Sequence, residues 1–140
     1  HLKTSPDGKY LLYTISDYGT FPIWHREADL QMLNLETQEI NKLTNVNDTC
    51  SDSYHCWSSN SRWFVLASKR DNGIYGKPYF AYIDKNGQAS KPFVLPQRDP
   101  ASYNFMLKSF NIPELSTGRA PFNARDIEKL YKGMDAEHIK

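Results

Sequence analysis

Short apolar runs separated by turn residues follow one another along most of this chain, a pattern typical of β-strands rather than helices. Residues 10–15 and 63–68 are apolar at nearly every position, so neither run alternates cleanly between an apolar and a polar face. A strand of this kind is buried on both faces of its sheet. The pattern therefore predicts sheets stacked on one another, in place of a two-layer sandwich with solvated outer faces.

The two apolar runs also belong to an internal repeat. The turn "SPDG" precedes the first run and "SSNS" precedes the second, and Lys9 aligns with Arg62 and Leu12 with Val65 at an offset of 53 residues. The serines of the second turn, Ser59 among them, are therefore expected to be hairpin residues. A nucleophile elbow would need Gly-x-Ser-x-Gly, which does not occur in the sequence.

Each unit continues as strand, tight turn and strand. Aligning Leu33 with Ile83 lowers the offset to 50 and assigns the difference to the intervening loop. In the second unit, Asn86-Gly87 predicts the hairpin, because both residues tolerate positive φ. A period of about 50 residues lies near that of β-propeller blades, each a four-stranded antiparallel sheet.

The sequence divides on this basis into two regions. Residues 1–97 form two blades, about 1–45 and 53–96, so the fold class is all-β and the propeller is partial. Residues 98–140 form a C-terminal tail with helices near 100–110 and 124–132, the second capped by Asn123. Because a partial propeller leaves apolar faces bare, we expect the tail from Tyr103 to Leu115 to cover one face. The residues expected to do so are Phe105, Phe110, Ile112 and Leu115. Self-association through exposed blade faces is the other expected remedy.

Composition excludes several classes of function. The net charge of +1 does not suit a nucleic-acid binder, and no apolar run is long enough for a transmembrane helix. Cys50 and Cys56 have neither redox-pair nor zinc-site spacing, so unpaired thiols and a local disulfide both stay open. His55 and Cys56 are expected on the innermost strand of the second blade in structural roles. We predict no catalytic residue, metal site or cofactor, and hence no enzyme.

Two aromatic loops offer a binding surface instead. "YGTFPIW" and "GIYGKPYF" both connect the second and third strands of their units, so they should emerge on one rim. The candidate rim residues for a ligand or partner are Tyr18, Phe21, Trp24, His25, Tyr75 and Tyr79. Aromatics folded onto their own blade are the alternative. In "HREAD", Asp29 is expected to bond backbone amides and Arg26 to pair with Glu27 in solvent. "KRDNG" is interpreted as a charged turn.

The motifs "SPDGKYLLYT", "DLQMLNLETQEINKLT" and "WSSNSRWFVLAS" resemble the TolB-like, WD-repeat-like propeller repeat. Asn60 and Ser61 replace the Asp-Gly usual in that repeat. The stretches "PIWHREADL", "KPYFAYID" and "NIPEL" resemble a poorly characterised bacterial envelope subfamily, over about residues 4–115. The resemblance implies a non-catalytic periplasmic or envelope module that binds a protein or polysaccharide. The alternative is the propeller accessory domain of a prolyl-oligopeptidase or tricorn-type peptidase, which a following hydrolase domain would support.

Overall fold

The computed structural model describes residues 1–133; the end of the expected tail, 134–140, lies outside the described residues. The chain is mostly β-strand. The elements in chain order are β1 (Leu2–Thr4), β2 (Tyr10–Ile15), the 3₁₀ helix η1 (Pro22–Trp24), β3 (Asp29–Asn34), β4 (Ile40–Asn41), β5 (Asp52–Trp57), β6 (Trp63–Ser68), β7 (Lys77–Tyr82), β8 (Phe93–Val94), α1 (Ser102–Phe105) and α2 (Ala124–Gly133).

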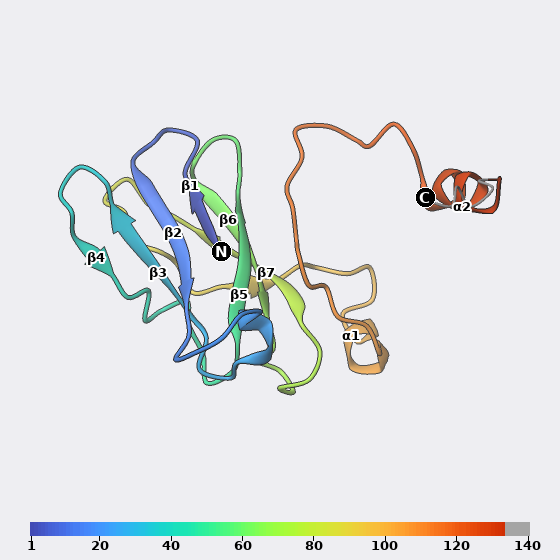
Figure 1. Cartoon of the computed structure of the whole chain (residues 1–140), viewed down its shortest axis with the longest axis horizontal. Helices are drawn as coiled ribbons and strands as arrows, with labels where there is room; N and C mark the ends of the chain where they lie inside the picture. Colours follow the sequence, from blue (N-terminus) through green and yellow to red (C-terminus); the bar gives the residue numbers. More distant parts are fainter. Residues whose placement is uncertain (134–140) are drawn as a thin grey trace, which may run out of the picture.

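The strands form two four-stranded antiparallel sheets, each built from consecutive strands. The first sheet has the order β1-β2-β3-β4 and the second β5-β6-β7-β8. The two sheets pack against each other, with β5 next to the first sheet (Figure 1). The tail leaves the second sheet and ends in α2, away from the body. The all-β expectation is thus confirmed at the level of two antiparallel sheets with a short C-terminal helix.

The predicted repeat is visible in the turns that open each sheet. The Ser5 hydroxyl accepts a hydrogen bond from Tyr10 N at 3.0 Å, and the Ser58 hydroxyl accepts one from Trp63 N at 3.0 Å, 53 residues later. Gly8 and Ser61 occupy the same turn position, and both have positive φ, 73° and 57°. Ser61 therefore adopts the same left-handed backbone conformation as Gly8, although it is not a glycine. The offset of 53 is confirmed for β2 and β6.

The offset predicted for the next strand is wrong by two residues. Leu35 N donates to Lys9 O at 2.8 Å, and Ile83 N donates to Arg62 O at 2.8 Å, so the equivalent of Ile83 is Leu35 and not Leu33. The pairing of β2 with β3 and of β6 with β7 agrees with an offset of 48. The alignment failed because the loop between the strands differs in length by more than the sequence pattern indicates. Since the error is even, it leaves every side chain on its correct face.

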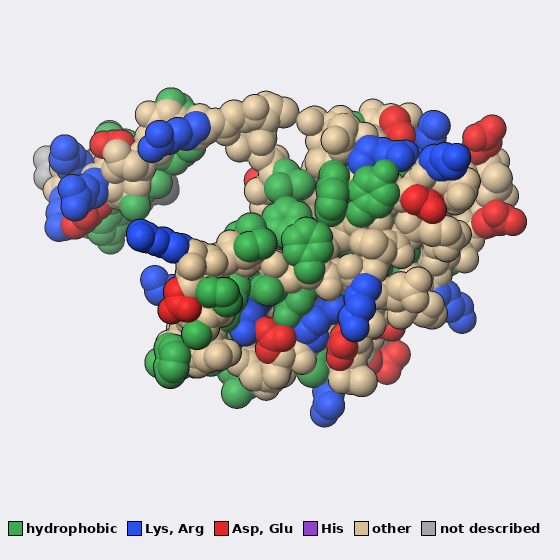
Figure 2. Space-filling view, turned by 180° about the vertical axis from the view of Figure 1, so that it is seen from behind, with side chains coloured by type: hydrophobic (Ala, Val, Ile, Leu, Met, Phe, Trp, Pro, Cys, Tyr) green, Lys and Arg blue, Asp and Glu red, His purple; other side chains and the backbone are tan. Residues whose placement is uncertain are grey.

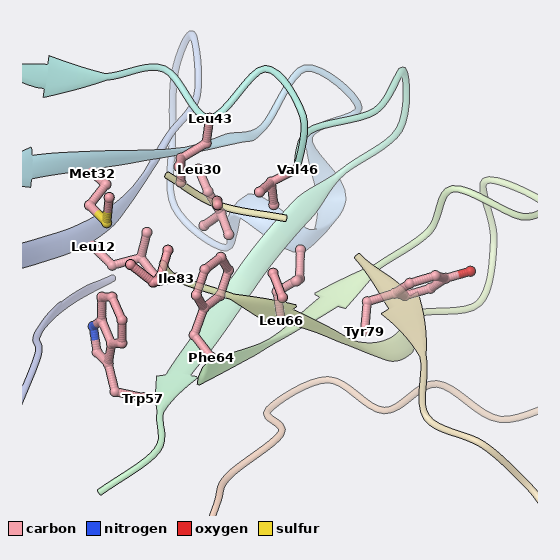
Figure 3. Packing of buried hydrophobic residues seen from close by; sticks show 12 residues of the cluster. Leu12, Leu30, Met32, Leu43, Val46, Trp57, Phe64, Leu66, Tyr79 and Ile83 are labelled. Atoms are coloured by element: carbon pink, nitrogen blue, oxygen red, sulfur yellow. The ribbon is translucent and has the colours of Figure 1, made fainter. Parts of the chain in front are cut away.

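The core lies between the two sheets (Figure 3). Leu12, Leu30 and Met32 of the first sheet face Phe64 and others of the second. Its buried members are Leu12, Leu30, Met32, Leu43, Val46, Trp57, Phe64, Leu66, Tyr79, Ala81, Ile83 and Ala89. Burial of apolar area at roughly 25 cal/mol per Å² makes this contact the main source of stability.

The hairpin after β7 combines a turn with a contact between the sheets. Gly87 has φ 76°, whereas Asn86 does not have positive φ, so only one residue of the pair uses the freedom that the sequence suggested. The carboxylate of Asp84 accepts hydrogen bonds from Asn86 N and Gln88 N, both at 2.8 Å. A Cβ at Gly87 would lie 2.6 Å from the hydroxyl of Tyr10 in the first sheet. Gly87 is therefore required both by its own turn and by the neighbouring sheet.

Replacing Gly87 by Val should destabilise the protein by about 1–2 kcal/mol, because a β-branched residue is strained at positive φ and Tyr10 must move. Thermal unfolding followed by circular dichroism measures the effect. Gly118→Val is the control, since a Cβ at that position meets nothing within 4 Å. Equal melting temperatures for the two variants would contradict this role of Gly87.

His55 lies in a β-bulge of β5 and links the two sheets. Pairing of β5 with β6 shifts register between Ser53 and Cys56, and the ring of His55, 1% exposed, donates from Nε2 to Leu12 O at 2.8 Å. Its Nδ1 has no hydrogen-bond partner among the described residues. Burial lowers the pKa of His55 to about 4, an effect that the hydrogen bond to Leu12 O opposes and that the charge of Lys3 adds to. The imidazole is therefore neutral near pH 7.

Acid should destabilise the fold through His55. The unfolded chain binds a proton at this residue near its ordinary pKa of 6.5, whereas the folded chain does so only near 4. The contribution of His55 to the free energy of unfolding is thus fully present above about pH 6.5. Below that pH it falls by about 1.4 kcal/mol per pH unit, and by roughly 3 kcal/mol in total at pH 4. Urea unfolding between pH 7 and 4 should show a smaller loss in His55→Gln than in the unchanged protein. Parallel curves would contradict the prediction.

The C-terminal tail differs from expectation at its first helix. The helix expected near 100–110 is confined to one turn, α1, because the chain turns extended at Met106 and Phe110 N then donates to Gly76 O at 2.8 Å. Phe110 and Leu115 lie against the second sheet along a hollow of about 240 Å³, as expected of a covering segment, whereas Ile112 lines the same hollow but is 62% exposed. Phe105, also expected to cover the sheet, is 82% exposed and does not.

The second tail helix occurs where the sequence indicates. The side chain of Asn123 accepts a hydrogen bond from Arg125 N at 2.9 Å and so caps α2. The carboxylate of Asp126 accepts a hydrogen bond from Asn123 N at 2.9 Å, which completes a reciprocal cap. No side chain of α2 is buried, and the helix stands away from the body (Figure 1).

Candidate functional site

Two loops that join the second and third strands of each sheet lie next to each other, as the sequence predicted. The first connects β2 to β3 and contains η1, and the second connects β6 to β7. Ile23 of the first loop is 5% exposed, and its Cδ1 lies 3.7 Å from the Cβ position of Gly76 in the second. The Ser51 hydroxyl donates to Pro22 O at 2.9 Å and fixes η1 against the start of β5. One rim therefore carries both loops.

A hollow of about 380 Å³ opens between these loops. Trp24, 77% exposed, stands at its edge, and Lys69 holds its Nζ 4.5 Å from the centre of the indole ring. Lys69 is itself only 8% exposed, and burial lowers its pKa, which nearby Cys50 partly opposes. The residues that line the hollow are Ile23, Trp24, Arg26, Cys50, Ser51, Lys69, Arg70, Asp71, Asn72 and Gly73.

The cations of the hollow are not equivalent. Arg70 is neutralised by Asp52 at 2.8 Å, and Asp71 is engaged by Lys77 at 2.6 Å. Within residues 1–133, no carboxylate lies within 4 Å of the Lys69 amine. The hollow therefore offers a positive charge beside an exposed aromatic ring, an arrangement that suits an electron-rich or acidic group.

A buried ion pair supports the base of the hollow. Asp52 is fully buried, and burial raises the pKa of its carboxyl, an effect that Arg70 and the neighbouring donors oppose. Arg70 also donates to Val46 O at 2.8 Å and lies 4.6 Å from the centre of the Tyr79 ring. The second carboxylate oxygen accepts from Asp48 N at 2.7 Å. The pair thus joins β5, the end of β6 and the loop before β5.

Replacing Asp52 by Ala should cost about 3–5 kcal/mol, because it leaves the Arg70 guanidinium, only 11% exposed, without its counter-charge. Chemical denaturation measures the loss. Lys132→Ala, which breaks an exposed ion pair on α2, is the control and should unfold like the unchanged protein. If Asp52→Ala matched this control, the pair would not support the loops.

The other rim residues predicted from the sequence have different positions. Tyr18 is 74% exposed and packs edge-on against His25, with ring centres 4.7 Å apart. Phe21 is also exposed, with φ 57°, and Tyr75 is half-buried. Tyr79 is 6% exposed, with its hydroxyl donating to Asp71 at 2.7 Å, and burial raises its pKa. The ring of Tyr79 therefore belongs to the core and is closed to a partner.

The interactions expected of "HREAD" differ as well. Arg26 donates from Nε to Thr49 O at 3.1 Å, while Glu27 lies 3.3 Å from His25 Nδ1, so Arg26 and Glu27 do not pair. The backbone of Leu30 is bonded by the Asn47 side chain, at 2.9 Å to both its N and its O, and not by Asp29. Desolvation, followed by the charge of Asp52, raises the pKa of Asp29. The side-chain amide of Asn47 can bond both the N–H and the C=O of Leu30, whereas a carboxylate could bond only the N–H.

The cysteines and the serine that could be chemically reactive form no catalytic arrangement among the described residues. Cys50 and Cys56 are both free thiols, and Ser59 is an exposed turn residue. Among residues 1–133, no group of three or more His, Cys, Asp or Glu side chains is placed to hold a metal ion. No helix in that range has the length and apolarity needed to cross a membrane.

Sequence reasoning missed Lys69, Arg70 and Cys50 as parts of the rim. The sequence predicts a charged turn at "KRDNG", and its first two residues directly follow the end of β6 at Ser68. In the structure Lys69 lies over the ring of Trp24 and Arg70 pairs with Asp52. The chain matches no known family model. No curated protein sequence matches it either.

Proposed function

We propose that this chain is a non-catalytic binding or scaffold module of the bacterial cell envelope, built from two TolB-like propeller blades, that binds a protein or glycan partner at its rim. The observation that carries the proposal is the exposed Trp24 ring beside Lys69 at the edge of the hollow. A large aromatic surface beside a positive charge is a frequent anchor for recognition.

Two features support the blade assignment. Each sheet has four antiparallel strands in chain order, and equivalent turn bonds recur 53 residues apart. The sheets also stack with apolar residues on both faces of β6, where Phe64 and Val65 are both buried. Stacked four-stranded units of this kind are the building principle of propellers. The envelope location rests on the sequence resemblance alone.

The rim is rigid enough to act as a preformed site. Ile23 and the Ser51 bond hold η1 in place, and the Asp52–Arg70 pair holds the opposing loop. Preorganised side chains lose little conformational freedom when a partner binds, which favours affinity. A sugar ring or an aromatic side chain could stack on Trp24 while an acidic group meets Lys69.

Replacing Trp24 by Ala should weaken binding about tenfold or more, and Lys69→Gln should weaken only acidic ligands, in a salt-dependent manner. Binding is measured against immobilised neutral oligosaccharides, uronic-acid oligosaccharides and peptides with free carboxyl termini. Leu107→Ala removes an equally exposed apolar side chain from the tail and is the control. Unchanged binding in Trp24→Ala, or no binding to any probe by the unchanged protein, would overturn the proposal.

A further inference from the structure

The two sheets pack against each other through different faces. The first sheet buries the face that carries Leu12, Leu30 and Met32, here called its inner face. The second buries the face that carries Trp57, Phe64, Leu66, Tyr79, Ala81 and Ile83. The contact is therefore head-to-tail and not symmetric.

The repeat relates each buried face to an outer face of the other sheet. With offsets of 53 for β2 and 48 for β3, Leu12 corresponds to Val65 and Met32 to Phe80. Val65, Phe80 and Phe93 are neighbours in register on the outer face of the second sheet. The outer face of the second sheet thus carries a copy of the surface that the first sheet buries, and the tail covers the part of it at Val65.

The converse holds for the first sheet. By the same offsets, Phe64 corresponds to Leu11, Leu66 to Tyr13 and Ala81 to Leu33. These residues lie on its outer face, which is completed by Leu2, Ile15, Leu35 and Ile40. Thr4 and Gln31 are the polar substitutions on it, in the places of Trp57 and Tyr79. The outer face of the first sheet is accordingly a copy of the surface that the second sheet buries.

Both outer faces retain exposed apolar groups. Leu2 is 68% exposed and Ile40 58% on the first sheet, and Phe93 is 47% exposed on the second. Hydrophobic side chains gather near the middle of the molecule in the reverse view (Figure 2). Contiguous apolar surface of this kind marks an interaction site.

We propose that the outer face of the first sheet binds the outer face of the second sheet in another copy of this chain, repeating between molecules the contact that each makes internally. The two outer faces correspond, by the repeat, to the two buried faces that already pack against each other between the sheets. Contacts between unlike faces continue from copy to copy, or close into a ring if the rotation allows.

The tail limits this association. The segment 110–115 lies against Val65 and Phe80, and Glu114 reaches Lys3 of β1 at 3.5 Å. It leaves Trp63, Tyr82 and Phe93 partly exposed. A second copy therefore competes with the segment for part of the face, so that association rises with protein concentration.

Sedimentation of the full chain and two variants tests the proposal between about 10 µM and 1 mM, the range of weak association. Ile40→Glu places a charge on the outer face of the first sheet, and Phe93→Glu does so on the second. The unchanged protein should form dimers and larger species, and each variant alone should be monomeric. An equimolar mixture of the two should regain a dimer and nothing larger, because each variant keeps the face that the other lacks.

Ile74→Glu, on the rim loop and 63% exposed, is the control and should associate like the unchanged protein. If circular dichroism shows that a variant is unfolded, Leu2→Asp and Leu95→Asp form a second pair on the same two faces. A monomeric unchanged protein would overturn the proposal. So would association of either variant alone, which indicates like-with-like pairing, or a mixture that stays monomeric.

Discussion

The apolar contact between two unlike sheet faces, which includes Phe64, holds the two sheets of the body together. Phe64 is fully buried and meets Trp57 edge-on, with ring centres 5.6 Å apart. The outer faces also carry apolar side chains, but the tail covers only part of the outer face of the second sheet. The turn at Gly87 lies against Tyr10 of the first sheet, whereas the rim loops are fixed by the Ser51–Pro22 bond and the Asp52–Arg70 pair. An apolar sheet face must be buried against another element, so the two sheets stabilise each other.

Most of the strand architecture could be predicted from the sequence. Apolar runs on both strand faces and turn residues at equal spacing located β2 and β6, and the N-cap of α2 was correct at Asn123. The two-residue error in aligning Leu33 with Ile83 has a physical origin, since side chains repeat every second residue and an even slip preserves the apolar pattern. Helix-like spacing after Asp99 failed beyond Phe105, because backbone bonding of Phe110 to the second sheet replaced helical bonds.

The rim was only partly accessible to sequence reasoning. Connecting loops in equivalent positions correctly placed the aromatic segments at one edge, and Trp24 is exposed there. What the pattern could not supply were contacts between residues distant in the chain, such as Lys69 over Trp24 and Arg70 on Asp52. Tyr79 illustrates the same limit, since its place within β7 gives it an inward orientation that composition does not reveal.

The bulge in β5 has a consequence for how such a repeat can change length. Two residues of β5 oppose one of β6 at this point, and Tyr54 takes up the extra residue with φ 45°. Insertions or deletions of two residues within a strand leave the apolar faces in place, whereas a single residue exchanges them. The bulge absorbs an odd change locally, so that His55 still bonds Leu12 and Trp57 still reaches the core. Within the strands, copies of the repeat can therefore differ in length by two residues at a time. A difference of one residue needs a bulge, which returns the following side chains to their original faces.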